Sequence, residues 1–216
     1  MRRFFGKTEA VFDILYLAAA LILAAVLLCA RGESAVKPLA GAMALILVFG
    51  DSFHLIPRIM SIITGQADRY AAAAGRGKQI ASVTMTLFYV LLWHLGCALF
   101  PMPRASALTG VVIGLAALRV ILCLPRQNEW ASASPPVLWG ALRNIPFLLL
   151  GLVVAEAYFR GGAAVPELSL MWLAVLLSFA FYLPVVLWSN RHRMLGMLML
   201  PKACVYLWII FMFTSL

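Results

Sequence analysis

Four polar side chains share one face of a predicted helix inside a long apolar stretch. Asp51, His54, Arg58 and Ser61 stand at positions i, i+3, i+7 and i+10 between about residues 38 and 65. A helix places residues with these spacings along one stripe. Charged and titratable groups are costly in lipid, so they normally face a protein interior or a water-filled cavity. The stripe therefore predicts a polar site among membrane-spanning helices.

The residue types in this stripe predict proton transfer. Asp51 and His54 could handle protons together, because imidazole titrates near neutrality and responds to a carboxylate one turn away. The same pair could serve as general acid and base in an enzyme that modifies lipid. No G-x-S-x-G, P-loop or dinucleotide motif accompanies it, so we assign no catalytic residue from sequence. We also predict no metal and no cofactor, because the three histidines show no HxxxH or HExxH spacing.

The composition identifies the class of molecule that carries the stripe. The chain of 216 residues is 64% hydrophobic and 12% charged, whereas soluble domains are about 45–50% apolar and about 25% charged. We predict an integral membrane protein in a bacterial inner membrane, with lipids as partners. The net charge of +9 does not indicate nucleic-acid binding, because the basic residues lie largely in loops and helix ends, as membrane topology requires.

Hydrophobic runs divide the chain into seven predicted helices, which form one polytopic domain over residues 1–216. The runs cover about 9–30, 38–64, 79–100, 106–124, 137–159, 167–189 and 195–215, and each is long enough to cross a bilayer. The longest connection on the amino-terminal side, 65–78, contains Gly75, Gly77 and three basic residues, and we predict a flexible basic loop there. The fold class is an all-α seven-transmembrane-helix bundle.

The basic residues also predict the orientation of the bundle. Nine of them fall on the side of the amino terminus and four on the other side. The first group contains Arg2, Arg3, Lys7, Arg69, Arg76, Lys78, Arg126, Arg191 and Arg193; the second contains Arg31, Lys37, Arg104 and Arg160. The positive-inside rule then places the amino terminus in the cytoplasm and the carboxyl terminus outside.

A short internal similarity suggests a repeat. Residues 52–57 of the second predicted helix read Ser-Phe-His-Leu-Ile-Pro, and residues 180–184 of the sixth read Ala-Phe-Tyr-Leu-Pro. With one helix between two groups of three, both groups would have the same orientation, as in transporters built from parallel repeats. The alternative is a chance match between aromatic, leucine-rich helices.

Further polar residues lie in the cytoplasmic half of the predicted helices. The additional candidates for ligand binding or proton handling are Arg119, Arg143, Asn144, Tyr182 and Lys202. The predicted helices contain four basic residues, Arg58 included, and two acidic ones, Asp13 and Asp51, when the helix-end residues Glu9, Glu156 and Glu167 are left out. Because buried charge is normally paired, this excess of two favours an anionic ligand. The alternative for the arginines is that each reaches the interface as an anchor, and Lys202 could instead be neutralised by Asp51.

Two limited resemblances to known families follow from these residues. The aromatic sixth helix with Tyr182 and Trp188, followed by Lys202, resembles the retinal pocket of microbial rhodopsins, which implies a retinal Schiff base on Lys202. The third helix lacks the carboxylate counterion of that family. Gly50-Asp51 with a later His94 is similar to lysoplasmalogenase-like membrane hydrolases. The second acidic residue of that family is missing here, and two matching residues do not assign the chain to it.

Transport is the function that these observations favour most. We predict a carrier of a small anionic or amphipathic ligand, with a net-basic pocket open towards the cytoplasm and bends at Pro57, Pro184 and Pro201. The main alternative is a lipid-modifying enzyme that uses Asp51 and His54 as acid and base. Lesser alternatives are an assembly or sensor protein and a retinal-binding protein. A homo-oligomer is compatible with each of them.

Overall fold

A computed structural model describes residues 2–30, 35–101, 105–132, 134–162, 164–188 and 192–216. Within these ranges the secondary structure is helical, and seven helices are long and apolar enough to cross a membrane. Large apolar side chains such as Leu15, Ile22 and Ile121 are each more than 60% exposed on the outside of the bundle, as lipid contact requires. The predicted seven-helix membrane fold is confirmed.

The seven long helices alternate with short connections and 3₁₀ turns. Their bounds are α1 Arg2–Cys29, α2 Val36–Thr64, α3 Ala67–Leu99, α4 Ala105–Cys123, α5 Val137–Gly161, α6 Met171–Trp188 and α7 Met199–Met212. Short 3₁₀ helices span Arg126–Asn128, Pro166–Leu168, Arg193–Leu198 and Phe213–Ser215. The predicted orientation and the predicted repeat stay predictions, and Arg31, Arg104 and Arg191, which enter the charge count, lie outside the described residues.

The predicted loop at 65–78 is wrong. Helix α3 begins at Ala67, so only Gly65 and Gln66 separate it from α2. Gly65 makes the turn at φ 72°, in the left-handed region that favours glycine, and its N–H donates to the carbonyl of Ser61. The run of alanines at 71–74 favours a helix. The polar residues at 67–78 therefore belong to the first turns of α3 and not to a loop.

The predicted bend at Pro201 is also wrong, whereas Pro57 and Pro184 do lie inside helices α2 and α6. Pro201 is the third residue of α7, directly after a 3₁₀ helix. Proline is tolerated in the first turn of a helix because its missing N–H would have no intrahelical partner there. Lys202 therefore stands at the start of α7, not in its interior.

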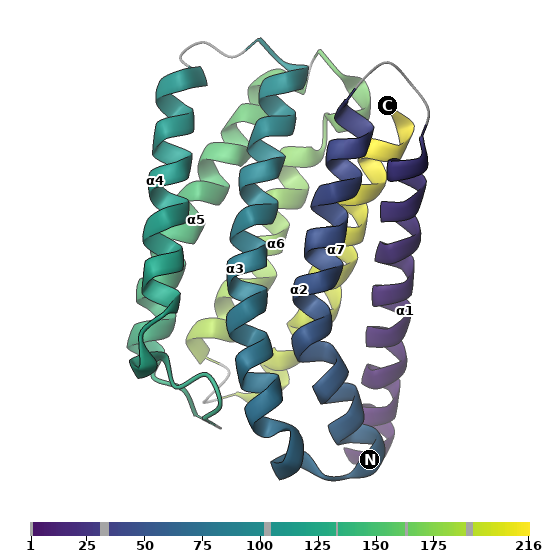
Figure 1. The fold of residues 1–216 in the computed structure, drawn as a ribbon, viewed down its shortest axis with the longest axis vertical. Coiled ribbons are helices and arrows are strands. Elements are labelled where there is room, and N and C mark those ends of the chain that lie inside the picture. Colours follow the sequence, from purple (N-terminus) through teal and green to yellow (C-terminus); the bar gives the residue numbers. More distant parts are fainter. Residues whose placement is uncertain (1, 31–34, 102–104, 133, 163, 189–191) are drawn as a thin grey trace.

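The helices form a closed ring around the cavity described below. Each helix packs against its neighbour in sequence, α1 contacts α7, and α3 also contacts α5. In Figure 1 the amino terminus, the α2–α3 turn and the α4–α5 and α6–α7 connections lie at the lower end, and the carboxyl terminus lies at the upper end. We call these the amino-terminal end and the carboxyl-terminal end of the bundle.

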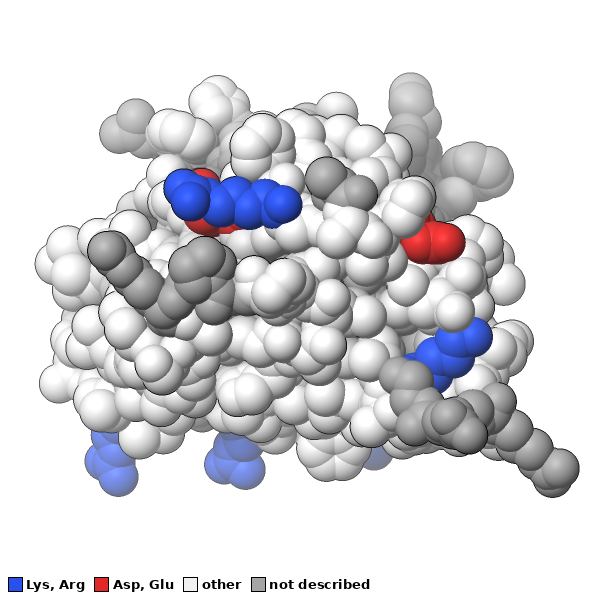
Figure 2. All heavy atoms as spheres, turned by 90° about the horizontal axis from the view of Figure 1, so that it is seen from above, with Lys and Arg blue, Asp and Glu red and all other residues white. Residues whose placement is uncertain are grey.

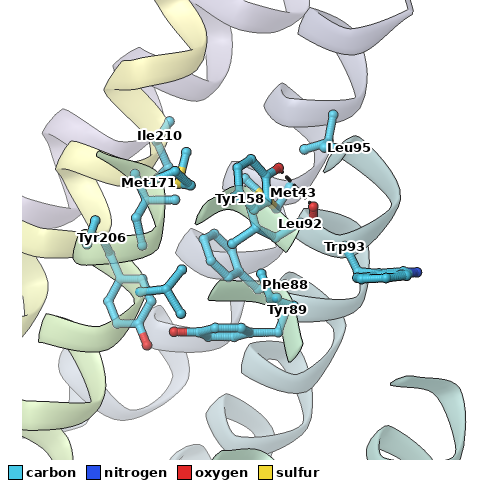
Figure 3. Close-up of a cluster of buried hydrophobic side chains, with 14 of the residues drawn as sticks. Met43, Phe88, Tyr89, Leu92, Trp93, Leu95, Tyr158, Met171, Tyr206 and Ile210 are labelled. Carbon is cyan, nitrogen blue, oxygen red and sulfur yellow. Dashed lines mark hydrogen bonds between the residues drawn. The ribbon is translucent and has the colours of Figure 1, made fainter. Parts of the chain in front are cut away.

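An aromatic layer fills the middle of the bundle. The ring of Tyr89 lies 5.0 Å from that of Phe147 and 5.5 Å from that of Phe179, and Phe88 lies 5.5 Å from Tyr206. The hydroxyl of Tyr89 is 2.7 Å from that of Ser178, so the buried polar atoms are paired. Figure 3 shows Phe88, Tyr89 and Tyr206 converging from α3 and α7. This layer separates the two ends of the bundle.

The carboxyl-terminal end carries few charged side chains. Figure 2, which looks onto this end, shows mostly uncharged surface with scattered basic and acidic groups. The described charged residues here are Lys37 at the start of α2, Glu156 and Arg160 near the end of α5, and Glu167 in the following 3₁₀ helix. Glu156 and Arg160 form an ion pair, 2.5 Å from Oε1 to Nη2. Charge is therefore balanced among the described residues of this end.

Gly77 permits the close approach of α3 to α2. A Cβ atom at Gly77 would collide with the backbone of Phe53 and His54. We expect Gly77→Ala to lower the free energy of unfolding by about 1–3 kcal/mol, the usual cost of overpacking. Thermal unfolding in detergent measures this. In Gly114→Ala, the matched control in α4, the new methyl meets open space. Equal melting temperatures for the two variants would contradict this packing role.

Candidate functional site

A cavity of about 400 Å³ occupies the amino-terminal half of the bundle. Every transmembrane helix contributes to its wall, and so does the α4–α5 connection. Its polar and charged lining residues are Glu9, Asp13, Tyr16, Asp51, His54, Arg58, Lys78, Ser82, Arg119, Trp130, Arg143, Tyr182, Lys202 and Tyr206. Phe147 and Tyr206 belong also to the aromatic layer, which forms the floor of the cavity.

The cavity brings together all the predicted site residues except one. Asp51, His54, Arg58, Arg119, Arg143, Tyr182 and Lys202 line it. Asn144 does not; its side chain is buried within α5 and donates a 2.7 Å hydrogen bond to the carbonyl of Gly140. The amide of Asn144 thus braces the helix next to Arg143. The functional role of the other seven stays a prediction.

Tyr16 of α1, rather than His54, holds the carboxylate of Asp51. The Tyr16 hydroxyl donates to Oδ2 of Asp51 at 2.7 Å. Nδ1 of His54 lies 4.0 Å from Oδ1 of Asp51, beyond hydrogen-bond distance, and has no hydrogen-bond partner among the described residues. The imidazole and the carboxylate are therefore neighbours within the cavity but do not form a hydrogen-bonded pair.

Arg58 forms an ion pair with Glu9 of α1. The predicted position of Glu9 at a helix end is wrong, because α1 begins at Arg2. Both side chains are partly exposed, so the pair contributes modestly to stability. Its effect on the site is to neutralise Arg58, which leaves the cationic character of the cavity to other residues.

A second, smaller cavity of about 200 Å³ lies between α2 and α3 and contains Ser61, the last member of the stripe. His54, Arg58 and Lys78 line both cavities. The polar stripe of α2 therefore runs from the large cavity, at Asp51, into the smaller one, at Ser61. These three side chains, two of them basic, are thus common to the walls of both cavities.

Arg119 lies fully inside the bundle. Only 2% of it is exposed, and its guanidinium carbon lies 3.1 Å from the centroid of the Phe147 ring. Nε and Nη1 have no hydrogen-bond partner among the described residues. The anchor interpretation is therefore wrong for Arg119, because its head group does not reach the surface. A cation–π contact compensates part of the charge but leaves N–H donors unsatisfied.

Arg143 is held by the connection between α4 and α5. Its Nη1 donates to Oδ1 of Asn128 at 2.7 Å, and its guanidinium lies 4.2 Å over the ring of Trp130. Asn128 is fully buried and donates to the carbonyls of Leu122 and Pro125. The connection is thus tied to the end of α4 and covers one side of the cavity. Arg143 contributes to this structure as well as to the wall.

Lys202 lies against tyrosines rather than against an acid. Its Nζ is 4.6 Å from the ring centroid of Tyr182 and 5.1 Å from that of Tyr206. Among the described residues it forms no ion pair, so the expected direct pairing with Asp51 is not observed. The ammonium group is therefore free to meet a ligand.

Sequence reasoning missed several residues that line the cavity. Glu9, Asp13 and Tyr16 stand at i, i+4 and i+7 of α1 and line the wall together. This spacing is the signal that could have revealed them. Lys78 was assigned to the predicted loop, although its spacing to Ser82 and Met85 is equally helical. Predicted helix starts that lie too far along the chain explain the omission of Glu9 and Lys78, because α1 begins at Arg2 and α3 at Ala67.

The overall charge of the wall is positive. Five basic side chains line the cavity (Arg58, Lys78, Arg119, Arg143 and Lys202), against three carboxylates (Glu9, Asp13 and Asp51). One ion pair, between Glu9 and Arg58, joins residues of opposite charge. The arrangement can therefore bind an anion, and the described residues contain no cluster of metal-ligating side chains.

Comparisons with known proteins add no identification. No protein-family model matches the chain, and neither curated proteins nor solved structures give a match. The described part of the chain contains seven helices long and apolar enough to cross a membrane, which is consistent with a multi-pass membrane protein.

Proposed function

We propose that this protein carries a small anionic, amphipathic ligand across a bacterial inner membrane and binds it in the large cavity. The observation that supports this most is the wall, in which five basic side chains meet three carboxylates and Arg119 is buried without an acidic partner. A buried charge normally has a counterion. The ligand is the counterion in this proposal.

The remainder of the wall fits an apolar part of the same ligand. Leu55, Met85, Phe147, Val185 and Leu200 line the cavity beside the charged groups. A volume of about 400 Å³ lies within the range of pockets that hold small organic molecules. Apolar side chains next to a basic cluster favour an amphipathic anion over a fully hydrated one.

Carrier function is favoured by the position of the cavity. The aromatic layer forms its floor, and the cavity lies at the amino-terminal end, which is cytoplasmic in the predicted orientation. Pro57 lies inside α2 and Pro184 inside α6, beside lining residues of both helices, and each proline removes one backbone hydrogen bond of its helix. Helices weakened by proline around a binding site favour the rearrangements that a carrier needs. Rearrangement of the aromatic layer would then open the site to the other side.

A carrier has to expose its site to both sides of the membrane in turn, which can be tested by labelling. We expect Ser82→Cys, in a chain whose native cysteines are replaced by serine, to react with a membrane-impermeant maleimide in inverted and in right-side-out vesicles. Ala24→Cys is the control, because Ala24 is fully buried in α1 and does not line the cavity. Reaction of Ser82→Cys from one side only would refute the carrier proposal.

Acid–base catalysis on a lipid is the second candidate, because Asp51 and His54 line the same cavity. Their separation of 4.0 Å would have to shorten in a complex. One-sided labelling of Ser82→Cys, combined with turnover of a lipid by the purified protein, would favour this function over transport.

A further inference from the structure

We infer that the cavity contains an oxyanion subsite centred on Arg119, which binds the phosphoryl group of a phosphate monoester. The inference rests on the proposed function, since it names the chemical class of the anion that the cavity would carry. The steps below use the burial of Arg119, the positions of its neighbours and the charge of the wall.

Arg119 lies in the wall of the cavity and has buried donors without a partner in the described part of the chain. It lines the wall, is 2% exposed, and has no hydrogen-bond partner for Nε or Nη1 among the described residues. A buried donor without a partner is costly, so native proteins rarely leave one. The face of the Phe147 ring attracts the cation but accepts no hydrogen bond in the guanidinium plane. Two phosphoryl oxygens fit the planar fork of an arginine.

Two further cations extend the subsite from neighbouring helices. Lys202 lines the same wall as Arg119, with its Nζ 4.6 Å from the ring centroid of Tyr182. Arg143 lines the same wall, and its Nε is buried with no hydrogen-bond partner among the described residues. Helices α4, α5 and α7 thus each supply one cation, and none of the three is in an ion pair within the described part of the chain.

The charge of the wall indicates a dianion. Glu9 and Arg58 neutralise each other. The remaining lining residues are four basic ones and two carboxylates, Asp13 and Asp51, so the surplus is two positive charges. A phosphate monoester carries about −1.5 to −2 at pH 7 and balances this surplus. A carboxylate or a phosphodiester supplies only one negative charge.

Binding of model anions to the full-length protein in a neutral detergent tests the subsite. The probes for calorimetry are inorganic phosphate, hexyl phosphate and hexanoate. We expect wild type to bind hexyl phosphate more tightly than hexanoate. Arg119→Gln should weaken hexyl phosphate binding about 10- to 100-fold, through the loss of charge-assisted hydrogen bonds. Arg160→Gln is the control, because Arg160 is exposed at the other end of the bundle.

The outcomes separate this inference from the carrier proposal. Equal affinity for hexanoate and hexyl phosphate would overturn the dianion assignment. Unchanged hexyl phosphate binding in a folded Arg119→Gln variant, or no binding by wild type, would overturn the subsite, while labelling of Ser82→Cys from both sides would still support a carrier. Arg119→Lys keeps the charge without the fork, and we expect intermediate affinity. Binding of inorganic phosphate as tight as hexyl phosphate identifies a free phosphate group; binding of hexyl phosphate alone identifies an amphipathic ester.

Discussion

Arg119→Met is expected to stabilise the ligand-free protein while it removes anion binding. Methionine fills a similar volume and leaves no charge inside the bundle. Replacement of buried ionic groups by apolar ones commonly stabilises proteins by about 1–4 kcal/mol. Loss of the contact with Phe147 offsets part of this gain, because a desolvated cation–π contact contributes about 2 kcal/mol. We therefore expect a net increase of up to about 2 kcal/mol in the free energy of unfolding.

Thermal unfolding of purified protein without added anions measures this effect, and Arg143→Met is the matched control. Arg143 donates to Asn128, which is fully buried, so its removal leaves an unpaired acceptor. We expect Arg143→Met to lower stability by about 1–3 kcal/mol. If Arg119→Met lowers the melting temperature as much as Arg143→Met does, Arg119 is a structural residue and the ligand-binding account loses its main support.

Asp51→Asn is expected to abolish coupling of uptake to protons and to leave the fold intact. The asparagine Oδ1 can still accept the hydrogen bond from Tyr16, so the packing of α1 against α2 is retained. The substitution removes the carboxylate beside His54 in the cavity. The amide that replaces it neither gains nor loses a proton near neutral pH. We expect uptake driven by a pH gradient to fall about 100-fold or more, as for the loss of other acid–base groups.

Uptake of labelled hexyl phosphate into proteoliposomes with an imposed pH gradient measures this. The control is Asp68→Asn, because Asp68 is exposed in the first turn of α3 and lines neither cavity. Asp51→Asn should keep exchange of hexyl phosphate without a gradient, since the basic wall is unchanged. If the pH gradient drives uptake by Asp51→Asn as strongly as uptake by wild type, Asp51 does not take part in proton coupling.

Most of the fold could be predicted because hydrophobic length dominates membrane insertion. Seven apolar runs of about the right length identify seven helices, whatever their packing. The same criterion failed at 67–78, where α3 continues as a helix with polar residues and two buried glycines. Hydropathy measures contact with lipid, and this part of α3 packs instead against α2 and the α4–α5 connection.

The site could be predicted only where helical spacing within one segment carried the signal. Asp51, His54 and Arg58 share a stripe that is visible in the sequence. The partners of these residues come from α1, and pairing of Tyr16 with Asp51 or Glu9 with Arg58 requires knowledge of which helices are neighbours. Similarly, Arg119 could be an anchor or a buried group until the rotation of α4 in the bundle was known.

Mass spectrometry of the small molecules that co-purify with the protein tests the central claim most directly. Wild type and Arg119→Met are purified in parallel in a neutral detergent, extracted, and compared without preselecting a compound class. The account predicts that an anionic, phosphate-bearing molecule is enriched with wild type and lost from Arg119→Met, which remains folded. Equal recovery of the same molecules from both proteins, or enrichment of neutral and cationic molecules alone, would contradict it.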